Sequence, residues 1–423
     1  MRILVWCWFA AAVAAQSPTA WLDAELESLE SLYRHFHRHP ELSFQEKATS
    51  ARLGDELAAA GFEVVRGIGG TGLVGVMKNG DGPVGLLRAD MDALPIAEQT
   101  GLPYASPPAG TAADGQPIGV MHACGHDVHM TCLVGTARWA AAHRDAWHGT
   151  LLLVGQPAEE RGAGAKAMMA AGIYDRVPKP DFLIALHTFA DGPTGTVGVR
   201  PGFALANVDS VDITMFGRGG HGSTPHKTID PIVQAAQFVT AAQTIVAREI
   251  DPLQPAVVTV GSIHGGSKHN IIGDRCHLQL TLRSYDPKVR QHLMEAVARL
   301  ARSVAEGARA PAPEVTFSEG LPSLYNSPEL TAKVRAALCS ELGESNVFET
   351  PASMGAEDFG LLAPEGIPVC MFQLGTVAPD RLARLRAEGA VPALHSALYH
   401  PDARAAIRTG VRAHCATLAA LMR

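Results

Sequence analysis

The chain has 423 residues, of which 47% are hydrophobic and 18% are charged, and its formal net charge is −7 at pH 7. This composition suits a buried core and excludes a disordered chain, while the lack of a basic run excludes the charge pattern of a nucleic-acid-binding protein. The length fits two or three domains, or one large α/β domain with an insertion. We therefore expect a folded protein whose partners are small molecules or peptides.

The first 15 residues predict a secretory signal peptide. Arg2 precedes an apolar run at residues 3–12, and Val13, Ala14 and Ala15 provide the small residues of a cleavage site. Because the run is too short to span a bilayer, we expect no stable membrane anchor. The sequence thus predicts an exported protein, periplasmic or secreted, cleaved near Ala15. The six cysteines beyond it are widely spaced, and we interpret all but Cys124 as mainly buried apolar residues rather than disulfides.

Helical and strand patterns alternate through the first half of the chain. The periodicity predicts helices at 20–37, 45–60, 129–143 and 163–171, and strands at 62–65, 70–77, 83–88, 149–154 and 182–186. The turn residues 79–82, Asn-Gly-Asp-Gly, predict that strands 70–77 and 83–88 form a β-hairpin. This order of elements favours an α/β fold.

Residues 121–129, Met-His-Ala-Cys-Gly-His-Asp-Val-His, are the centre of the predicted site. The stretch holds three histidines, a cysteine and an aspartate, and each of these can bind a borderline transition metal. Ala123 and Gly125 are small enough for the backbone to turn tightly around an ion. A helix start with exposed side chains is the alternative.

Further potential ligands follow the predicted strands. Asp90 and Asp92 come after strand 83–88, where one carboxylate could orient a metal-binding histidine and the other cap a loop, although capping alone explains both. Glu159 and Glu160 come after strand 149–154, and adjacent carboxylates can divide metal binding from proton transfer. His187 is expected at the end of strand 182–186. Strand ends are where α/β proteins place chemistry, so we expect one metal site.

The element pattern changes beyond residue 202. Strands at 208–216, 256–264, 276–285 and 314–318, with helices at 230–248 and 287–307, give the order β-α-β-β-α-β of a ferredoxin-like unit. We expect a catalytic domain at 18–201 and 321–423, with an inserted domain at 202–320. The glycine-rich turn 217–226 presents His221, and an ordinary hairpin is the alternative. Helices at 327–342 and 401–422, a strand at 367–374 and an acidic loop at 353–359 complete the larger domain.

Taken together, these residues resemble the zinc- or manganese-dependent amidohydrolases of the aminoacylase and carboxypeptidase superfamily. The closest branch is that of hippurate hydrolase, N-acyl-amino-acid amidohydrolases and auxin-conjugate hydrolases. The resemblance runs from about Leu22 to the carboxyl end, through segments that end at Asp92, His126, Glu160, His187, His221, Asn270, Asp358 and His395. It implies a zinc-peptidase-like catalytic domain with helices around a mixed sheet, plus an inserted lid or dimerisation domain.

The resemblance also implies roles for single residues. Two divalent ions, Mn²⁺ or Zn²⁺, would be bound by Cys124, His126, Glu160, His187 and His395, with Cys124 as the bridge. Glu159 would be the general base, and His221 would stabilise the oxyanion in its own or a partner's site. Pairing through the insert implies a homodimer. Substrate contacts are expected at Asn270, His226 and Arg283, with Arg218 and Arg200 as alternatives for a carboxylate and a structural salt bridge possible for each.

The predicted activity is hydrolysis of the amide bond of N-acyl amino acids by a metal-activated water. A dipeptidase or carboxypeptidase with the same two-metal site is the alternative, and a panel of substrates separates the two. A metal-binding protein without activity is the non-enzyme alternative, and the Glu159–Glu160 pair argues against it because structure alone needs no general base. Residues 397–401 and Gly273 differ from the family pattern, which leaves the local substrate preference open.

Overall fold

The computed structural model describes residues 18–108, 110–111 and 117–423. The predicted signal peptide lies outside these residues and stays a prediction. Within the described residues, no helix is long and apolar enough to cross a membrane. The described cysteines are free, and all except the half-buried Cys339 are buried, as the sequence indicated.

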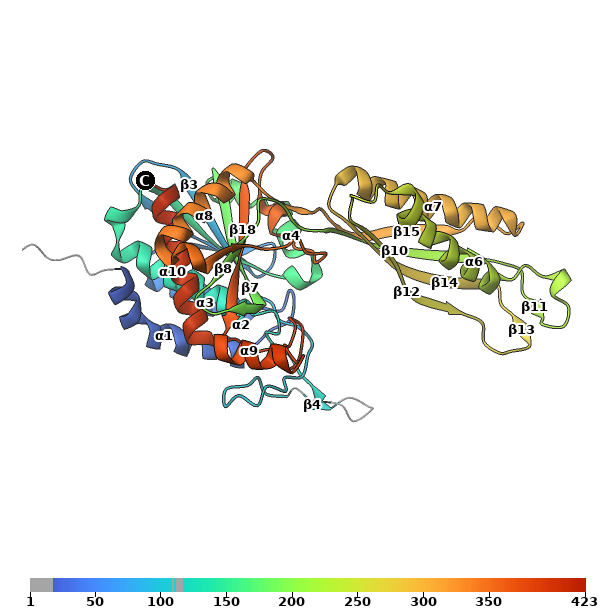
Figure 1. The fold of residues 1–423 in the computed structure, drawn as a ribbon, viewed down its shortest axis with the longest axis horizontal. Helices are drawn as coiled ribbons and strands as arrows, with labels where there is room; N and C mark the ends of the chain where they lie inside the picture. The colour runs from blue at the N-terminus through green and yellow to red at the C-terminus, as the bar shows by residue number, and fades with distance from the viewer. Residues whose placement is uncertain (1–17, 109, 112–116) are drawn as a thin grey trace, which may run out of the picture.

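The larger body is built on one eight-stranded mixed sheet (Figure 1). Its strand order is β1-β2-β6-β3-β7-β18-β8-β17. The bounds are β1 Glu63–Ile68, β2 Gly72–Asn79, β3 Val84–Asp90, β6 Gly149–Gln156, β7 Phe182–Pro193, β8 Val197–Val199, β17 Val347–Glu349 and β18 Val369–Val377. The central strands β6, β3, β7 and β18 run parallel, are almost wholly buried and are rich in Leu, Val and Ile, as expected of strands covered on both faces.

Helices cover both faces of this sheet. One face packs against α1 Pro18–Arg38, α2 Lys47–Ala59, α3 His126–Ala142, α8 Pro328–Leu342 and α10 Ala403–Leu421. The other face packs against the shorter α4 Gly164–Ala170 and α5 Ile173–Arg176. The amphipathic patterns read from the sequence account for these helices, and Ser327 caps α8 with Pro328 in its first turn. The predicted α/β fold is confirmed.

The predicted hairpin is wrong. Strands β2 and β3 do not pair with each other, because β6 lies between them, antiparallel to β2 and parallel to β3. The apolar strand β6 forms ladders on both sides, and a direct β2–β3 pairing would leave it outside the core. The strand that carries His187 is also longer than predicted: its parallel pairing with β18 continues through Phe189 and Pro193, so His187 lies within the strand.

The second body is a four-stranded antiparallel sheet with two helices, drawn in yellow-green to orange in Figure 1. Its strand order is β12-β14-β10-β15, formed by β10 Asn207–Phe216, β12 Ala256–Gly265, β14 Arg275–Ser284 and β15 Glu314–Leu321. The helices α6 Pro231–Thr244 and α7 Pro287–Gly307 pack on this sheet, and each is capped by an aspartate, Asp230 or Asp286, followed by proline. These are the elements predicted for a ferredoxin-like insert.

Several short elements were not predicted. They are β4 Gly110–Thr111, β5 Pro117–Ile118, β8, β9 Gly202–Leu205, β11 Gly220–His221, β13 Ile271–Ile272, β16 Leu324–Asn326, β17 and α9 Pro379–Ala387. Strands of two to four residues are too short to produce a periodic pattern, so they depend on the tertiary fold. The pair β9–β16 lies where the chain passes between the two bodies.

Candidate metal centre and active site

The start of α3 is held against β7. Gly125 caps the helix in a left-handed conformation, with φ of 82°, which glycine adopts without strain. A Cβ atom there would also lie 2.7 Å from the Thr188 side chain, so the tight contact requires glycine. The Thr188 hydroxyl donates to the Cys124 carbonyl at 2.6 Å. Cys124, just before α3, and His126, its first residue, are thereby fixed beside His187 on β7.

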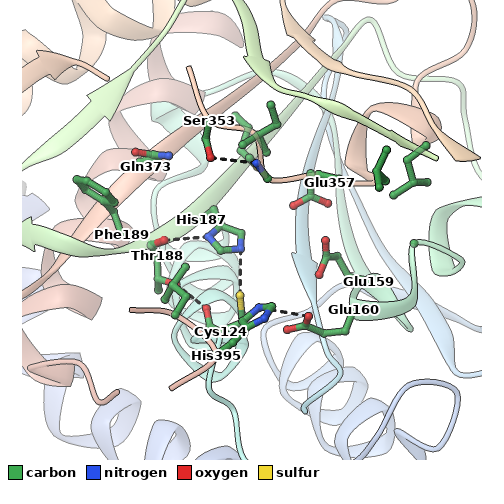
Figure 2. Close-up of a pocket in the computed structure, with 18 of the residues that line it drawn as sticks. Cys124, Glu159, Glu160, His187, Thr188, Phe189, Ser353, Glu357, Gln373 and His395 are labelled. Atoms are coloured by element: carbon green, nitrogen blue, oxygen red, sulfur yellow. Dashed lines mark hydrogen bonds and ion pairs between the residues drawn. The ribbon is translucent and has the colours of Figure 1, made fainter. Parts of the chain in front are cut away.

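Two groups of potential metal ligands meet at Cys124. One comprises Cys124, His126 and His187, the other Cys124, Glu160 and His395, and within each group the ligand atoms lie within 4.8 Å of one another. Figure 2 shows Cys124, His187, Glu160 and His395 around one cavity, with Cys124 Sγ 3.6 Å from His187 Nε2 and Glu160 Oε2 3.4 Å from His395 Nε2. The structure thus brings together all five predicted ligands.

Hydrogen bonds orient two of the imidazole rings. The Nδ1 atom of His126 donates to the Asp92 carbonyl at 2.8 Å, and that of His187 donates to the Thr188 carbonyl at 2.9 Å. A carbonyl can only accept, so each Nδ1 carries the proton and each Nε2 keeps its lone pair free for a metal ion. The buried atoms Nε2 of His126 and Oε1 of Glu160 have no hydrogen-bond partner among the described residues. These donors fit divalent zinc or manganese ions.

Asp92 positions the glutamate pair. Its two carboxylate oxygens accept hydrogen bonds at 3.1 Å from the backbone N–H groups of Glu159 and Glu160, and Ser43 donates to it at 2.7 Å. Asp92 therefore caps the loop with its carboxylate and orients His126 with its backbone carbonyl.

Asp90 helps to position the metal centre through hydrogen bonds on the side away from the cavity. Its Oδ1 atom accepts from His129 Nδ1 at 2.5 Å, and His129 Nε2 accepts from the Thr188 N–H at 2.8 Å. This chain of bonds joins β3 to α3 and β7. The other oxygen, Oδ2, lies 3.5 Å from His126 Nε2. Asp90 is thus placed as a positioning residue, and His129, a potential ligand by its sequence, lies beside it as a second one.

Glu159 is suited to proton transfer. Its carboxylate points into the cavity beside that of Glu160 (Figure 2), and Oε2 lies 3.9 Å from His126 Nε2. Burial, reinforced by the negative charge of Glu357, raises the pKa of Glu159 well above its ordinary value. A carboxylate with a raised pKa holds an abstracted proton more readily than an ordinary one, which is what a general base requires.

The structure contains a buried arginine behind the metal centre that the sequence did not single out. Arg88 on β3 lies 2.7 Å from Asp90 and 2.7 Å from Glu357, and its Nε donates to Gln156 at 2.9 Å. All four side chains are buried. Arg88 thus ties the acidic loop before residue 359 to the central sheet. A cation within an apolar strand pattern was the only available signal.

We expect Arg88→Met to lower the free energy of unfolding by about 3 kcal/mol, because Asp90 and Glu357 would stay buried without their cation. Urea denaturation followed by circular dichroism measures the loss. Arg302→Met, at an exposed position of α7, is the control and should leave the midpoint nearly unchanged. Equal midpoints for the two variants would contradict a stabilising role of Arg88.

A cavity of about 910 Å³ opens above these residues. The inserted body contributes Val208, Ser210, Arg283 and Leu321 to its wall, the connecting strand β9 contributes Leu205, and the catalytic body contributes Phe189, Met371 and others. Of the cations considered for a carboxylate, Arg283 alone lines this cavity. Arg200 instead bonds the Phe203 and Thr350 carbonyls, and Arg218 bonds the Lys227 carbonyl.

Three predicted site residues lie elsewhere in the chain. His221, Asn270 and His226 are exposed and do not line the cavity. His221 and Asn270 belong to the paired segments around β11 and β13, at the tip of the insert far from the eight-stranded sheet (Figure 1). Within one chain, therefore, these residues do not join the candidate site. The four-stranded sheet separates the loops around β11 and β13 from the cavity, which lies at the opposite end of this sheet.

Two ligand groups share one cysteine, and they lie beside a proton acceptor and an open cavity. This arrangement is typical of a hydrolase that uses metal ions. Residues 86–388 match peptidase family M20/M25/M40, and the chain belongs to this family. The predicted resemblance is confirmed.

Individual relatives agree with this assignment. The chain is 39% identical over 348 residues to thermostable carboxypeptidase 1 of Saccharolobus solfataricus, covering 81% of this chain and 84% of the relative. It is 38% identical over 349 residues to an N-acetylcysteine deacetylase of Bacillus subtilis, covering 82% and 87%. A crystal structure of a dinuclear metal-binding peptidase from Bacillus subtilis superposes with a TM-score of 0.76 at 30% identity, covering 94% and 98%. The protein is a metal-dependent amidohydrolase or peptidase.

Proposed function

We propose that the protein hydrolyses the amide bond of N-acyl amino acids. The observation that carries the proposal is the half-buried Glu159 carboxylate beside two ligand groups that share Cys124. Similarity to an N-acetylcysteine deacetylase supports this substrate class. Similarity to a carboxypeptidase keeps a dipeptidase or carboxypeptidase as the second candidate, because the same site serves either amide.

We infer that Cys124, His126, Glu160, His187 and His395 would hold two divalent ions, manganese or zinc, with Cys124 common to both. Bound ions of this kind lower the pKa of water and polarise a carbonyl group. The hydrogen bonds of Asp92 and Thr188 orient His126 and His187, so that each Nε2 atom stays available as a ligand beside Cys124. Asp90 and His129 fix the strand and helix from which these ligands project.

In the proposed reaction Glu159 takes a proton from the attacking water. The water oxygen bonds to the acyl carbon, the carbon–nitrogen bond breaks, and Glu159 gives its proton to the leaving nitrogen. The products are a carboxylic acid and a free amino acid. Arg283 is the proposed contact for the amino-acid carboxylate, since it lines the cavity and keeps donors beyond its single bond to the Met354 carbonyl.

We further propose a homodimer formed through the insert. His221, Asn270 and His226 lie far from the cavity of their own chain, so a second copy would have to bring them to it. His221 would there stabilise the oxyanion, a contribution of about 3 kcal/mol for one donor. Export after cleavage near Ala15 is part of the same proposal.

Hydrolysis assays on matched substrates test the proposed function. N-Acetylalanine, N-acetylcysteine and hippurate are compared with alanylalanine and with N-blocked dipeptides, and the released amino acid is quantified. We expect a kcat/KM at least about tenfold higher for the N-acyl amino acids, equivalent to roughly 1.4 kcal/mol. Turnover restricted to peptides would instead support the carboxypeptidase or dipeptidase.

A further inference from the structure

Among the described residues of the cavity wall outside the metal centre, the acidic side chains form ion pairs and the arginines do not. Outside the metal centre the wall holds two acidic residues, and both are bound to arginines: Asp191 to Arg386 at 2.8 Å and Glu357 to Arg88 at 2.7 Å. The wall also holds two arginines, Arg161 and Arg283. Neither of them is paired with an acidic side chain of the described residues. The wall therefore has an uncompensated positive charge at two places.

Arg161 stands directly beside the metal centre. It ends the short turn Glu159–Arg161, so it follows the proposed base and one proposed ligand in the chain. Its side chain is exposed, and no hydrogen bond or ion pair joins it to another described residue. The next residue, Gly162, packs so closely on Leu321 that a Cβ atom would lie 2.7 Å from that side chain. This contact fixes the turn against the inserted body.

The two arginines lie at opposite ends of one row of residues. In the sheet of the insert, Leu321 pairs with Val208, and Val208 pairs with Arg283. Adjacent strands are about 4.8 Å apart, so Leu321 and Arg283 are separated by roughly 10 Å across the row. The Arg161–Gly162 turn lies at the Leu321 end. The apolar side chains of Val208 and Leu321 line the cavity between the two cations.

We propose that Arg161 is a specificity-determining residue that binds a second anionic group of the substrate. This inference depends on the proposed function, in which Arg283 binds the carboxylate of the amino acid. The substrate class is then a doubly anionic N-acyl amino acid, whose second carboxylate lies either on the amino-acid side chain or on the acyl group. A guanidinium presents paired donors that match a carboxylate, and this favours carboxylate over a neutral polar group.

Two pairs of nearly isosteric substrates test the proposal. N-Acetylglutamate is compared with N-acetylglutamine for the side chain, and N-succinylalanine with its terminal amide for the acyl group. We expect the wild type to prefer the acid in at least one pair by about tenfold or more in kcat/KM, mainly through KM, as a charged hydrogen bond provides. Arg161→Gln should abolish this preference by lowering kcat/KM on the acids more than on the amides, while Arg161→Lys should retain part of it.

Arg335→Gln, at an exposed position of α8 outside the cavity, is the matched control and should keep the wild-type preference. An acid preference that survives in Arg161→Gln, or equal rates on acid and amide in the wild type, would overturn the proposal. If no amide is cleaved, the proposed function fails. Calorimetry then measures binding of the same pairs to the Glu159→Gln protein and to the double variant that also carries Arg161→Gln. Binding that prefers the acid in the first protein and loses this preference in the second supports the role of Arg161. Equal binding of acid and amide, or no binding, overturns that role.

Discussion

Glu159→Gln should lower kcat by up to about 10,000-fold while the protein keeps its metal. The substitution preserves the size of the side chain and its place between Glu160 and Glu357, but an amide cannot accept the proton that the reaction releases. Glu159 is not a member of the two ligand groups that meet at Cys124, and His126 and Glu160, with which it forms another group, keep their places in those two. Its loss should therefore affect proton transfer and leave metal binding almost unchanged.

Kinetics on an N-acyl amino acid, together with metal analysis by mass spectrometry, measures both properties. Glu160→Gln is the matched control, because the adjacent residue is the proposed ligand: it should lose metal as well as activity. Substantial turnover in Glu159→Gln would contradict the assignment of the base. A metal-depleted Glu159→Gln protein would instead place Glu159 among the ligands.

Cys124→Ala should remove most of the bound metal and nearly all activity. The Sγ atom belongs to both ligand groups, so its removal weakens two sites at once. Replacement of residues that merely orient ligands already costs about 10- to 100-fold in metal affinity or activity, and we expect a larger loss for a shared ligand. The Gly125 and Thr188 contacts that hold the backbone should persist, because they do not involve the thiol.

Cys132→Ala is the control for that variant, since Cys132 is buried on α3, the helix that begins just after Cys124, and lies outside both ligand groups. Metal content is measured after dialysis, and a thermal melt of each metal-free protein checks that the fold persists. Full metal content in Cys124→Ala would refute its role as a ligand. Equal loss in both cysteine variants would point to a general destabilisation of α3.

The sequence predicted the elements with a long periodic pattern. Helices such as α7, with Asp286 as its cap and Pro287 after it, follow from local rules alone. The motif around Cys124 and the glutamate pair also identified the chemistry, because their residue types are rare in such close succession. The ferredoxin-like insert followed from the order of its strands and helices.

The remaining features depend on pairing between distant segments. The turn at residues 79–82 signals a hairpin, but β6, about 70 residues later, displaces the expected partner. Arg88 reads as an isolated cation in a strand until the fold brings Glu357 to it from 269 positions along the chain. His221 has a recognisable motif, yet sequence alone does not tell whether it serves its own chain or another.

The most direct test of the central claim is hydrolysis of an N-acyl amino acid by the purified protein before and after chelation, with bound metal quantified in parallel. We predict about two metal ions per chain, loss of amino-acid release when a chelator removes them, and recovery on addition of manganese or zinc. The ligand set predicts this outcome because Cys124 is common to both groups. Undiminished hydrolysis by a fully metal-free protein would contradict the account.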